Sequence, residues 1–281
     1  MLINLRTALA EVTCAGLGFN VTTLDALDAL MAVAERRPGP TILQMTDRYV
    51  DHFGESLINN WMVPRLAASP RAFVLHLDHA VDLDAVHRAL GLGFTSVMYD
   101  GSRQPLDHNV AETQLAAEAA RRAGASVEAE VGHVGGREDG AAPAEKSWLT
   151  TVEDARTFVA GVDVDALAIA VGNVHGARPL DQPPRLRLDR IRDIAAAVSV
   201  PLVLHGGSGL SPSLLQQAIR AGIRKVNIGT ELKRAWLAGI EAAAQDTQEP
   251  WEIRERTATR LMTTICQLER TVCPPEHPAH A

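Results

Sequence analysis

Phe73-Val74-Leu75-His76-Leu77-Asp78-His79 is the stretch of sequence from which the fold can be read. Its first part is apolar, as in a buried strand, and it ends on an aspartate beside a histidine. A strand that ends this way carries polar side chains to the rim of a site. We interpret Asp78 as a candidate proton carrier and His79 as a candidate metal ligand, and we place His76 in the interior. A lone histidine at such a position is more often held by backbone groups, so this interpretation needs partners elsewhere in the chain.

Similar apolar, β-branched runs recur along the chain and alternate with helical patterns. Strict alternation implies parallel strands, and eight repeats favour an α/β protein with a closed (β/α)8 TIM barrel. An open, doubly wound sheet is the alternative, and it would place its ligand at a switch point. The predicted strands cover residues 15–20, 40–45, 72–77, 94–98, 126–131, 166–171, 201–205 and 224–228. The predicted helices cover residues 23–36, 56–68, 83–90, 109–122, 151–160, 188–197 and 211–221.

One domain accounts for most of the chain. We expect residues 1–272 to form the barrel with extra C-terminal helices at 231–245 and 252–272, and residues 273–281 to be a disordered tail.

A net charge of -7 argues against nucleic acid or an anionic membrane as a partner. Cys14, Cys266 and Cys273 are odd in number and lack paired spacing, which indicates neither a disulfide framework nor a cysteine zinc knuckle. With no apolar stretch of membrane-spanning length, we expect a cytoplasmic protein.

Histidines gather at the predicted strand ends, where a barrel builds its active site. His79, His175 and His205 follow the third, sixth and seventh strands. Each alone could be a hydrogen-bonded core histidine, but together they favour a zinc site with an open position for substrate. A second divalent or monovalent cation could be held by Asp100 with Glu130 and Glu128, although carboxylates at strand ends also pair with arginine.

Three glycine-bearing turns follow the last strands, at residues 172–176, 205–209 and 227–230. Glycine allows backbone N–H groups to approach a phosphate closely, and the third turn also opens a helix. Small residues can equally form tight turns without a ligand. Three adjacent turns favour a phosphate pocket beside the metal, with candidate ligands Gly176, Gly206, Ser208, Asn227, Gly229 and Thr230. A glycine-hinged loop at 132–140 could be surface structure, or a lid that brings a carboxylate such as Glu138 over a substrate.

Six motifs resemble those of the class II, metal-dependent ketose-bisphosphate aldolases, which include fructose- and tagatose-bisphosphate aldolases. They occur in order at residues 76–79, 93–102, 128–140, 172–176, 201–209 and 225–232. The resemblance implies zinc at His79, His175 and His205, with Asp100 and Glu130 available to a second metal. It implies that Asp78 handles the proton of the hydroxyl that becomes the aldehyde, and Glu138 the proton on the carbon next to the ketone. It also implies that Asn227 orients the dihydroxyacetone part of the substrate and that the glycine turns hold its phosphate.

The chain departs from this family in the region that would recognise the aldehyde half. Ala177-Arg178-Pro179 stands where many relatives carry an aromatic residue and a lysine, Thr46–Tyr49 matches poorly, and Gly229 is nearer the tagatose type. A Schiff-base mechanism is disfavoured because Lys225 begins its strand, at the wrong end of a barrel. We expect an aldolase that releases dihydroxyacetone phosphate and forms a homodimer or tetramer. A zinc hydrolase using Asp78 and a non-catalytic sugar-phosphate sensor are the alternatives.

Overall fold

The computed structural model describes residues 1–136, 148–176 and 185–274. Its strands form one closed parallel barrel in the order β1 to β8, so the TIM-barrel prediction is confirmed and the open sheet is wrong. The closure leaves no exposed sheet edge, and every carboxyl end of a strand opens on the same face. The strands are Gly16–Asn20 (β1), Thr41–Thr46 (β2), Phe73–Ala80 (β3), Ser96–Tyr99 (β4), Ser126–Val131 (β5), Ala166–Ile169 (β6), Leu202–Leu204 (β7) and Ile223–Ile228 (β8).

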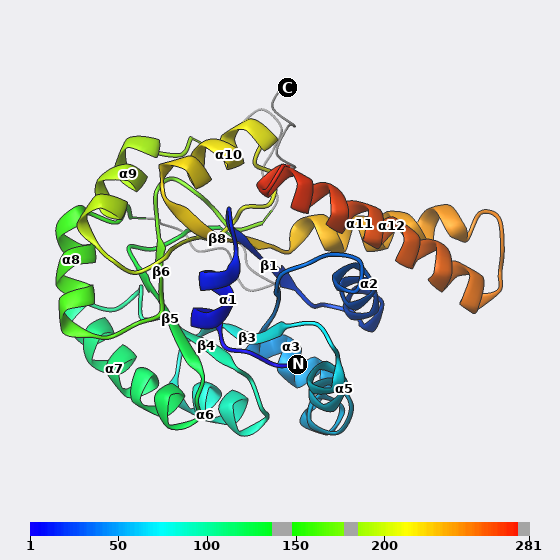
Figure 1. Ribbon diagram of the computed structural model, residues 1–281, viewed down its shortest axis with the longest axis horizontal. Coiled ribbons are helices and arrows are strands. Elements are labelled where there is room, and N and C mark those ends of the chain that lie inside the picture. The colour runs from blue at the N-terminus through cyan, green and yellow to red at the C-terminus, as the bar shows by residue number, and fades with distance from the viewer. Residues whose placement is uncertain (137–147, 177–184, 275–281) are drawn as a thin grey trace.

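Helices surround the barrel as an outer ring, seen in Figure 1. Those that follow the strands are Leu24–Ala34 (α2), Asp47–Phe53 (α3), Leu83–Gly91 (α6), Leu106–Arg122 (α7), Val152–Gly161 (α8), Leu188–Ala197 (α9), Pro212–Ala221 (α10) and Thr230–Ala243 (α11). Side-chain caps define several starts, because Thr23, Asp82, Thr151 and Ser211 each accept a hydrogen bond from a backbone N–H of the first turn.

A short N-terminal helix, α1 (Leu5–Glu11), closes the end of the barrel where the strands begin. In Figure 1 it lies within the ring of strands, and its Leu5 and Leu9 are buried against interior residues such as Val74 and Val203. The chain enters along β3, since the N–H of Ile3 donates to the carbonyl of Phe73. With this end plugged by apolar side chains, the opposite end is the one available for a site.

The segment between β2 and β3 differs from the expected single helix over 56–68. Helix α3 starts directly after β2, and it is followed by α4 (Glu55–Leu57), a π-helical turn at Ile58–Met62 and α5 (Val63–Ala68). Pro64, in the first turn of α5, cannot donate a backbone hydrogen bond, which is consistent with the break in helix type. Helix α3 therefore places residues 47–53 beside the rim of the barrel.

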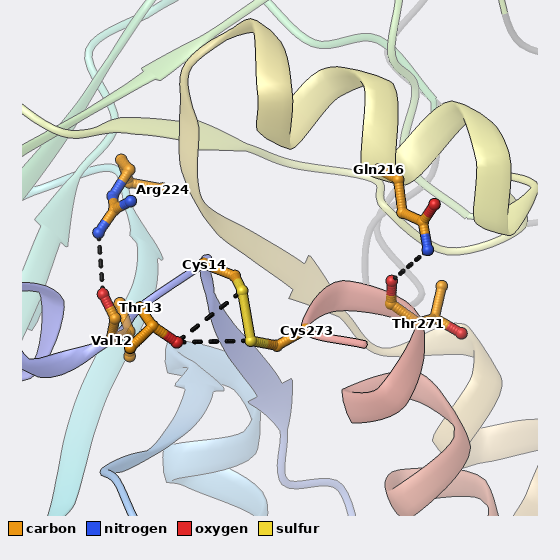
Figure 2. Close-up of a disulfide and its surroundings, with 7 residues drawn as sticks. All are labelled: Val12, Thr13, Cys14, Gln216, Arg224, Thr271 and Cys273. Atoms are coloured by element: carbon orange, nitrogen blue, oxygen red, sulfur yellow. Dashed lines mark hydrogen bonds between the residues drawn. A yellow bond between two sulfur atoms is a disulfide. The ribbon is translucent and has the colours of Figure 1, made fainter. Parts of the chain in front are cut away.

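The C-terminal helices α11 and α12 (Pro250–Val272) pack against each other and extend away from the barrel as an arm (Figure 1). The end of α12 returns to the start of β1, where Cys273 forms a disulfide with Cys14 (Figure 2). Their Cα atoms are 5.6 Å apart although the residues are 259 positions apart in sequence. The expectation of no disulfide was therefore wrong, because no local spacing could reveal this pair. The predicted disordered tail starts at Cys273, but this residue is held by the disulfide. Residues 275–281 of the predicted tail lie outside the described part of the chain.

Among the helices that the structure describes, none combines the length and the apolar character needed to cross a membrane.

Candidate metal and active site

Three histidines and one glutamate converge at the open end of the barrel. One ligand atom each from His79, Glu130, His175 and His205 lies within 4.8 Å of the others. The imidazole ring centres are 5.0 Å apart for His79 and His175, and 4.5 Å apart for His79 and His205. The strand ends that sequence reasoning assigned to a metal thus meet at one point, and the donor set is one that suits zinc.

His79 occupies an unusual backbone conformation. Across the described ranges it is the only non-glycine residue with a positive φ, at 53°. The pairing of β3 with β4 shifts register between Leu77 and Ala80, so His79 sits in a bulge near the end of a strand that runs three residues beyond the predicted one. A bulge re-aims a side chain at the cost of local backbone strain. The strained residue is the predicted ligand.

Asp100 follows β4 and contacts His79 rather than the cluster as a whole. Its Oδ2 atom lies 2.7 Å from Nδ1 of His79, and its Oδ1 accepts a hydrogen bond from the N–H of Ser102. Burial opposes ionisation, but these hydrogen bonds and the charge of His79 hold the pKa of Asp100 well below its usual range. Asp100 was predicted as a possible ligand of a second cation; here its carboxylate contacts His79, the predicted ligand of the first.

His205 is flanked by two buried carboxylates. Its Nδ1 lies 2.9 Å from Glu130 Oε2, and its Nε2 lies 3.0 Å from Glu128 Oε1. Burial and the charge of His79 would lower the pKa of His205, but the hydrogen bonds to Glu128 and Glu130 outweigh them and raise it to about 9. For His175, burial and the charges of His79 and His205 outweigh the charge of Asp100 and set the pKa well below the usual value.

The carboxylate of Asp78 is fully buried and held by three amide groups. Its Oδ2 accepts hydrogen bonds from Asn20 at 3.1 Å and Gln44 at 3.0 Å, and its Oδ1 accepts one from Asn227 at 3.1 Å. Burial would raise the pKa of Asp78, but the charges of His79 and Lys225 outweigh it and lower the pKa. The arrangement keeps an ionised acid in a defined position.

Gln44 was not assigned a role from the sequence, and Glu128, a possible ligand of a second cation there, contacts His205 and Lys225 instead. Gln44 is a polar residue inside an apolar strand, and it also donates to Asn20 Oδ1. A buried amide in such a run was the signal that could have drawn attention to it.

His76, which was placed in the interior, shares a hydrogen bond between its Nδ1 and the Oγ of Ser96. Burial and the charge of Lys225 lower the pKa of His76 to about 3.

The three glycine turns approach one another closely. A Cβ on Gly206 would lie 2.1 Å from the carbonyl oxygen of Val174, and Asn173 donates to the carbonyl of His205 at 3.0 Å. Ser208 connects the second and third turns, because its Oγ accepts hydrogen bonds from the N–H groups of Gly229 and Thr230. Gly176 and Gly206 both have a positive φ, of 82° and 61°, which favours glycine. The predicted phosphate-binding residues therefore lie on turns that share one region.

Two parts of the predicted site lie outside the described residues. These are Glu138, on the expected lid, and Ala177-Arg178-Pro179. The described start of the expected lid contacts the site, because the N–H of His175 donates to the carbonyl of Gly135 at 2.8 Å.

Lys225 is fully buried and its Nζ lies 2.9 Å from Glu128 Oε2, so its amine does not face a substrate.

Comparisons with known proteins identify the family of this chain. A profile of the family described as "Fructose-bisphosphate aldolase class-II" matches residues 4–273. The chain belongs to the class II fructose-bisphosphate aldolase family. A 6-phospho-5-dehydro-2-deoxy-D-gluconate aldolase of Halalkalibacterium halodurans is 36% identical, over 85% of this chain and 83% of its own length. A fructose-bisphosphate aldolase of Streptococcus pyogenes is 38% identical, over 78% of this chain and 74% of its own.

The fold comparison leads to the same family. The crystal structure of the YdjI aldolase from Escherichia coli K12 superimposes with a TM-score of 0.85 at 28% identity, and the match covers 97% of this chain and 98% of that one. The protein is thus an aldolase, a carbon–carbon lyase of class II, in a family that generally depends on a divalent metal. This membership decides against the zinc hydrolase and the non-catalytic sensor that the sequence left open.

Proposed function

We propose that this aldolase is zinc-dependent and reversibly cleaves a phosphorylated ketose into dihydroxyacetone phosphate and an aldehyde. The observation that carries the proposal is the position of Asp78, an ionised acid held by three amides, next to His79 of the metal cluster. Retro-aldol cleavage needs a base at one substrate atom and a stabilised negative charge at another. Asp78 would be the base, and the neighbouring metal cluster would hold the cation that stabilises the negative charge.

The donor set fits a zinc ion. His79, His175 and His205 would hold it, with Glu130 close by, and two of the imidazoles have a second nitrogen beside a carboxylate that can orient the ring. When bound, a divalent cation supplies a Lewis acid that stabilises negative charge on the ketone oxygen. The contact of Asp100 with His79 favours one catalytic metal over a second cation at Asp100 and Glu130.

The proton steps belong to side chains of the chain itself. Asp78 accepts the proton from the hydroxyl on C4 of the ketose, and the bond between C3 and C4 breaks. The two electrons of that bond remain on the dihydroxyacetone half. Asn227 donates to Asp78 and can orient both the acid and the substrate. Glu138 then donates a proton to C3, a role that rests on the family resemblance because the residue lies outside the described part of the chain. The lowered pKa of Asp78 suits a base that must be ionised before the reaction.

The dihydroxyacetone phosphate would be held through its phosphate by the turns around Gly176, Gly206, Ser208, Gly229 and Thr230. The support is their mutual contact and the start of the 14-residue helix α11 at Thr230, because a helix N-terminus favours an anion. The aldehyde half is less constrained. The relatives named above act on different compounds, so we propose fructose-1,6-bisphosphate, tagatose-1,6-bisphosphate and 6-phospho-5-dehydro-2-deoxy-D-gluconate as the substrates to compare.

The test is to incubate the zinc-loaded protein with these compounds and follow the release of dihydroxyacetone phosphate. We expect release from at least one of them, and loss of release after treatment with a chelator and after Asp78→Ala. Absence of release from every member of the panel, or release that survives chelation, would contradict the proposal.

We further propose that the protein acts in the cytoplasm as a homodimer or tetramer. The support is the composition of the chain and the projecting pair of helices α11 and α12 in Figure 1, which offers a large surface for a second copy. Sedimentation equilibrium at micromolar concentration measures the assembly, and a monomer there would contradict it.

A further inference from the structure

We propose that Glu128, held in place by Lys225, selects the nitrogen through which His205 binds the metal. In this arrangement the Nε2 of His205 keeps its proton and donates it to Glu128, while the Nδ1 of His205 faces the metal. Glu128 and Lys225 are then positioning residues that act on the metal through His205. The inference rests on the metal site proposed above and adds two residues to it that touch neither metal nor substrate.

Glu128 is a fully buried carboxylate on β5 that points into the barrel. Its two oxygen atoms have different partners: Oε1 is 3.0 Å from His205 Nε2, and Oε2 is 2.9 Å from Lys225 Nζ. Lys225 comes from β8 and is itself fully buried. A buried carboxylate is stable in its ionised form only with such partners. The pair therefore keeps a negative charge directly behind the imidazole of His205.

The position of the metal distinguishes the two sides of the ring. Glu130, which lies 2.9 Å from Nδ1 of His205, shares the metal cluster with it. Glu128, on the Nε2 side, does not belong to the cluster. A metal placed among His79, Glu130 and His175 would thus meet Nδ1 first.

Hydrogen-bond chemistry then decides the tautomer. An ionised carboxylate only accepts hydrogen bonds, and a neutral imidazole has one N–H and one lone pair. Glu128 Oε1 lies outside the metal cluster at 3.0 Å from Nε2 and can accept its proton, so the proton of His205 belongs on Nε2 and the lone pair needed by a metal is on Nδ1. His76 does not compete for this role, because its Nε2 is 3.9 Å from Glu128 Oε2, beyond hydrogen-bond distance, and its Nδ1 is engaged with Ser96.

The same arrangement accounts for a buried lysine that has no access to substrate. Lys225 lies near the start of β8, opposite Gly16 of β1 and Val203 of β7. Its side-chain hydrogen bond runs to Glu128, which in turn contacts His205. A substitution at Lys225 should therefore act through Glu128 rather than independently.

The first test observes the tautomer directly in the zinc-loaded wild-type protein labelled with ¹⁵N-histidine. We expect the His205 signal, assigned by its loss in His205→Gln, to show a protonated Nε2 and a metal-bound Nδ1. A metal-bound Nε2 would overturn the proposal. This measurement is made on the wild-type protein and needs no substrate and no Glu128 variant, so it holds even where a Glu128 variant fails to fold.

The second test measures zinc affinity by competition with a chelator. We expect Glu128→Gln to weaken zinc binding about 10- to 100-fold, as loss of a carboxylate behind a ligating imidazole typically does. The matched control is Glu241→Gln, the same change at an exposed position on α11, which should bind zinc as tightly as wild type. The double variant Glu128→Gln/Lys225→Met removes the buried charges together and should bind zinc as weakly as Glu128→Gln.

The outcomes separate this inference from the metal site itself. Wild-type zinc affinity in Glu128→Gln would overturn the inference and leave the proposed metal site standing. A much greater loss in the double variant would overturn the role given to Lys225. A wild-type protein that binds no zinc would overturn the metal site and, with it, the inference.

Discussion

Nδ1 of His79 lies 2.7 Å from Oδ2 of Asp100, so the predicted metal ligand on the third strand is braced by the acid that follows the fourth strand. His205 on the other side of the cluster has the corresponding contact with Glu128, but through Nε2. In the proposed metal site, Nε2 of His79 and Nδ1 of His205 would therefore face the metal. In both cases a carboxylate from another strand, or from the residue that follows it, contacts one ring nitrogen and can orient the imidazole.

Asp100→Asn should weaken zinc binding about 10- to 100-fold. The carboxylate accepts from His79 at one oxygen and from the N–H of Ser102 at the other, whereas an asparagine has a single oxygen for both. Chelator competition measures the change, and Asp107→Asn, at an exposed position on α7, is the control. Unchanged affinity in Asp100→Asn would show that Asp100 does not orient the metal ligand.

Asp78→Ala should reduce kcat for cleavage by about 10²- to 10⁴-fold, the usual contribution of a positioned base. Zinc content should stay at the wild-type level, because Asp78 is not a member of the metal cluster. Metal analysis of the purified variant beside steady-state rates makes this distinction. Loss of zinc in this variant would instead make Asp78 a part of the metal site.

Gly18→Ala should disturb Asp78 from a distance. A Cβ on Gly18 would lie 2.1 Å from Gln44 Oε1, so Gln44 must move, and its hydrogen bond to Asp78 moves with it. We expect kcat to fall with zinc retained, and the free energy of unfolding to fall by about 1 to 3 kcal/mol through overpacking. Gly91→Ala is the control, because a Cβ there meets nothing within 4 Å. Equal rates in the two variants would contradict a role for Gln44.

Cys273→Ser should lower the free energy of unfolding by about 2 to 4 kcal/mol under non-reducing conditions, because the Cys14–Cys273 bond closes a long loop. Urea unfolding measures it, with Cys266→Ser, a change of the free cysteine, as the control. In a reducing buffer the difference between wild type and Cys273→Ser should vanish. A wild-type protein with three titratable thiols before reduction would contradict the disulfide.

Glu138→Ala should slow the exchange of the C3 proton of dihydroxyacetone phosphate with solvent, because the family resemblance assigns that proton to Glu138. Tritium release measures the exchange, and zinc content should match the wild type. Loss of zinc would instead identify Glu138 as a ligand.

The barrel was predictable because strand and helix patterns repeat, and each pattern depends on residues a few positions apart. The convergence of His79, His175 and His205 was predictable for a related reason: in a closed parallel barrel, residues that follow different strands meet at one end. Helix α3 was missed because it begins at Asp47 with no turn after β2, and the Cys14–Cys273 pair because 259 positions separate it.

The sequence by itself determined the fold class, the histidines and Asp78, since these follow from periodicity and from the position of polar residues at strand ends. Only the tertiary structure decided that Asp100 braces His79, that Gln44 holds Asp78, and that Lys225 supports Glu128 behind His205. These contacts are hydrogen bonds between side chains that come from different strands or from the residues that follow them. The register and closure of the barrel set those distances, and no pattern within a single strand contains them.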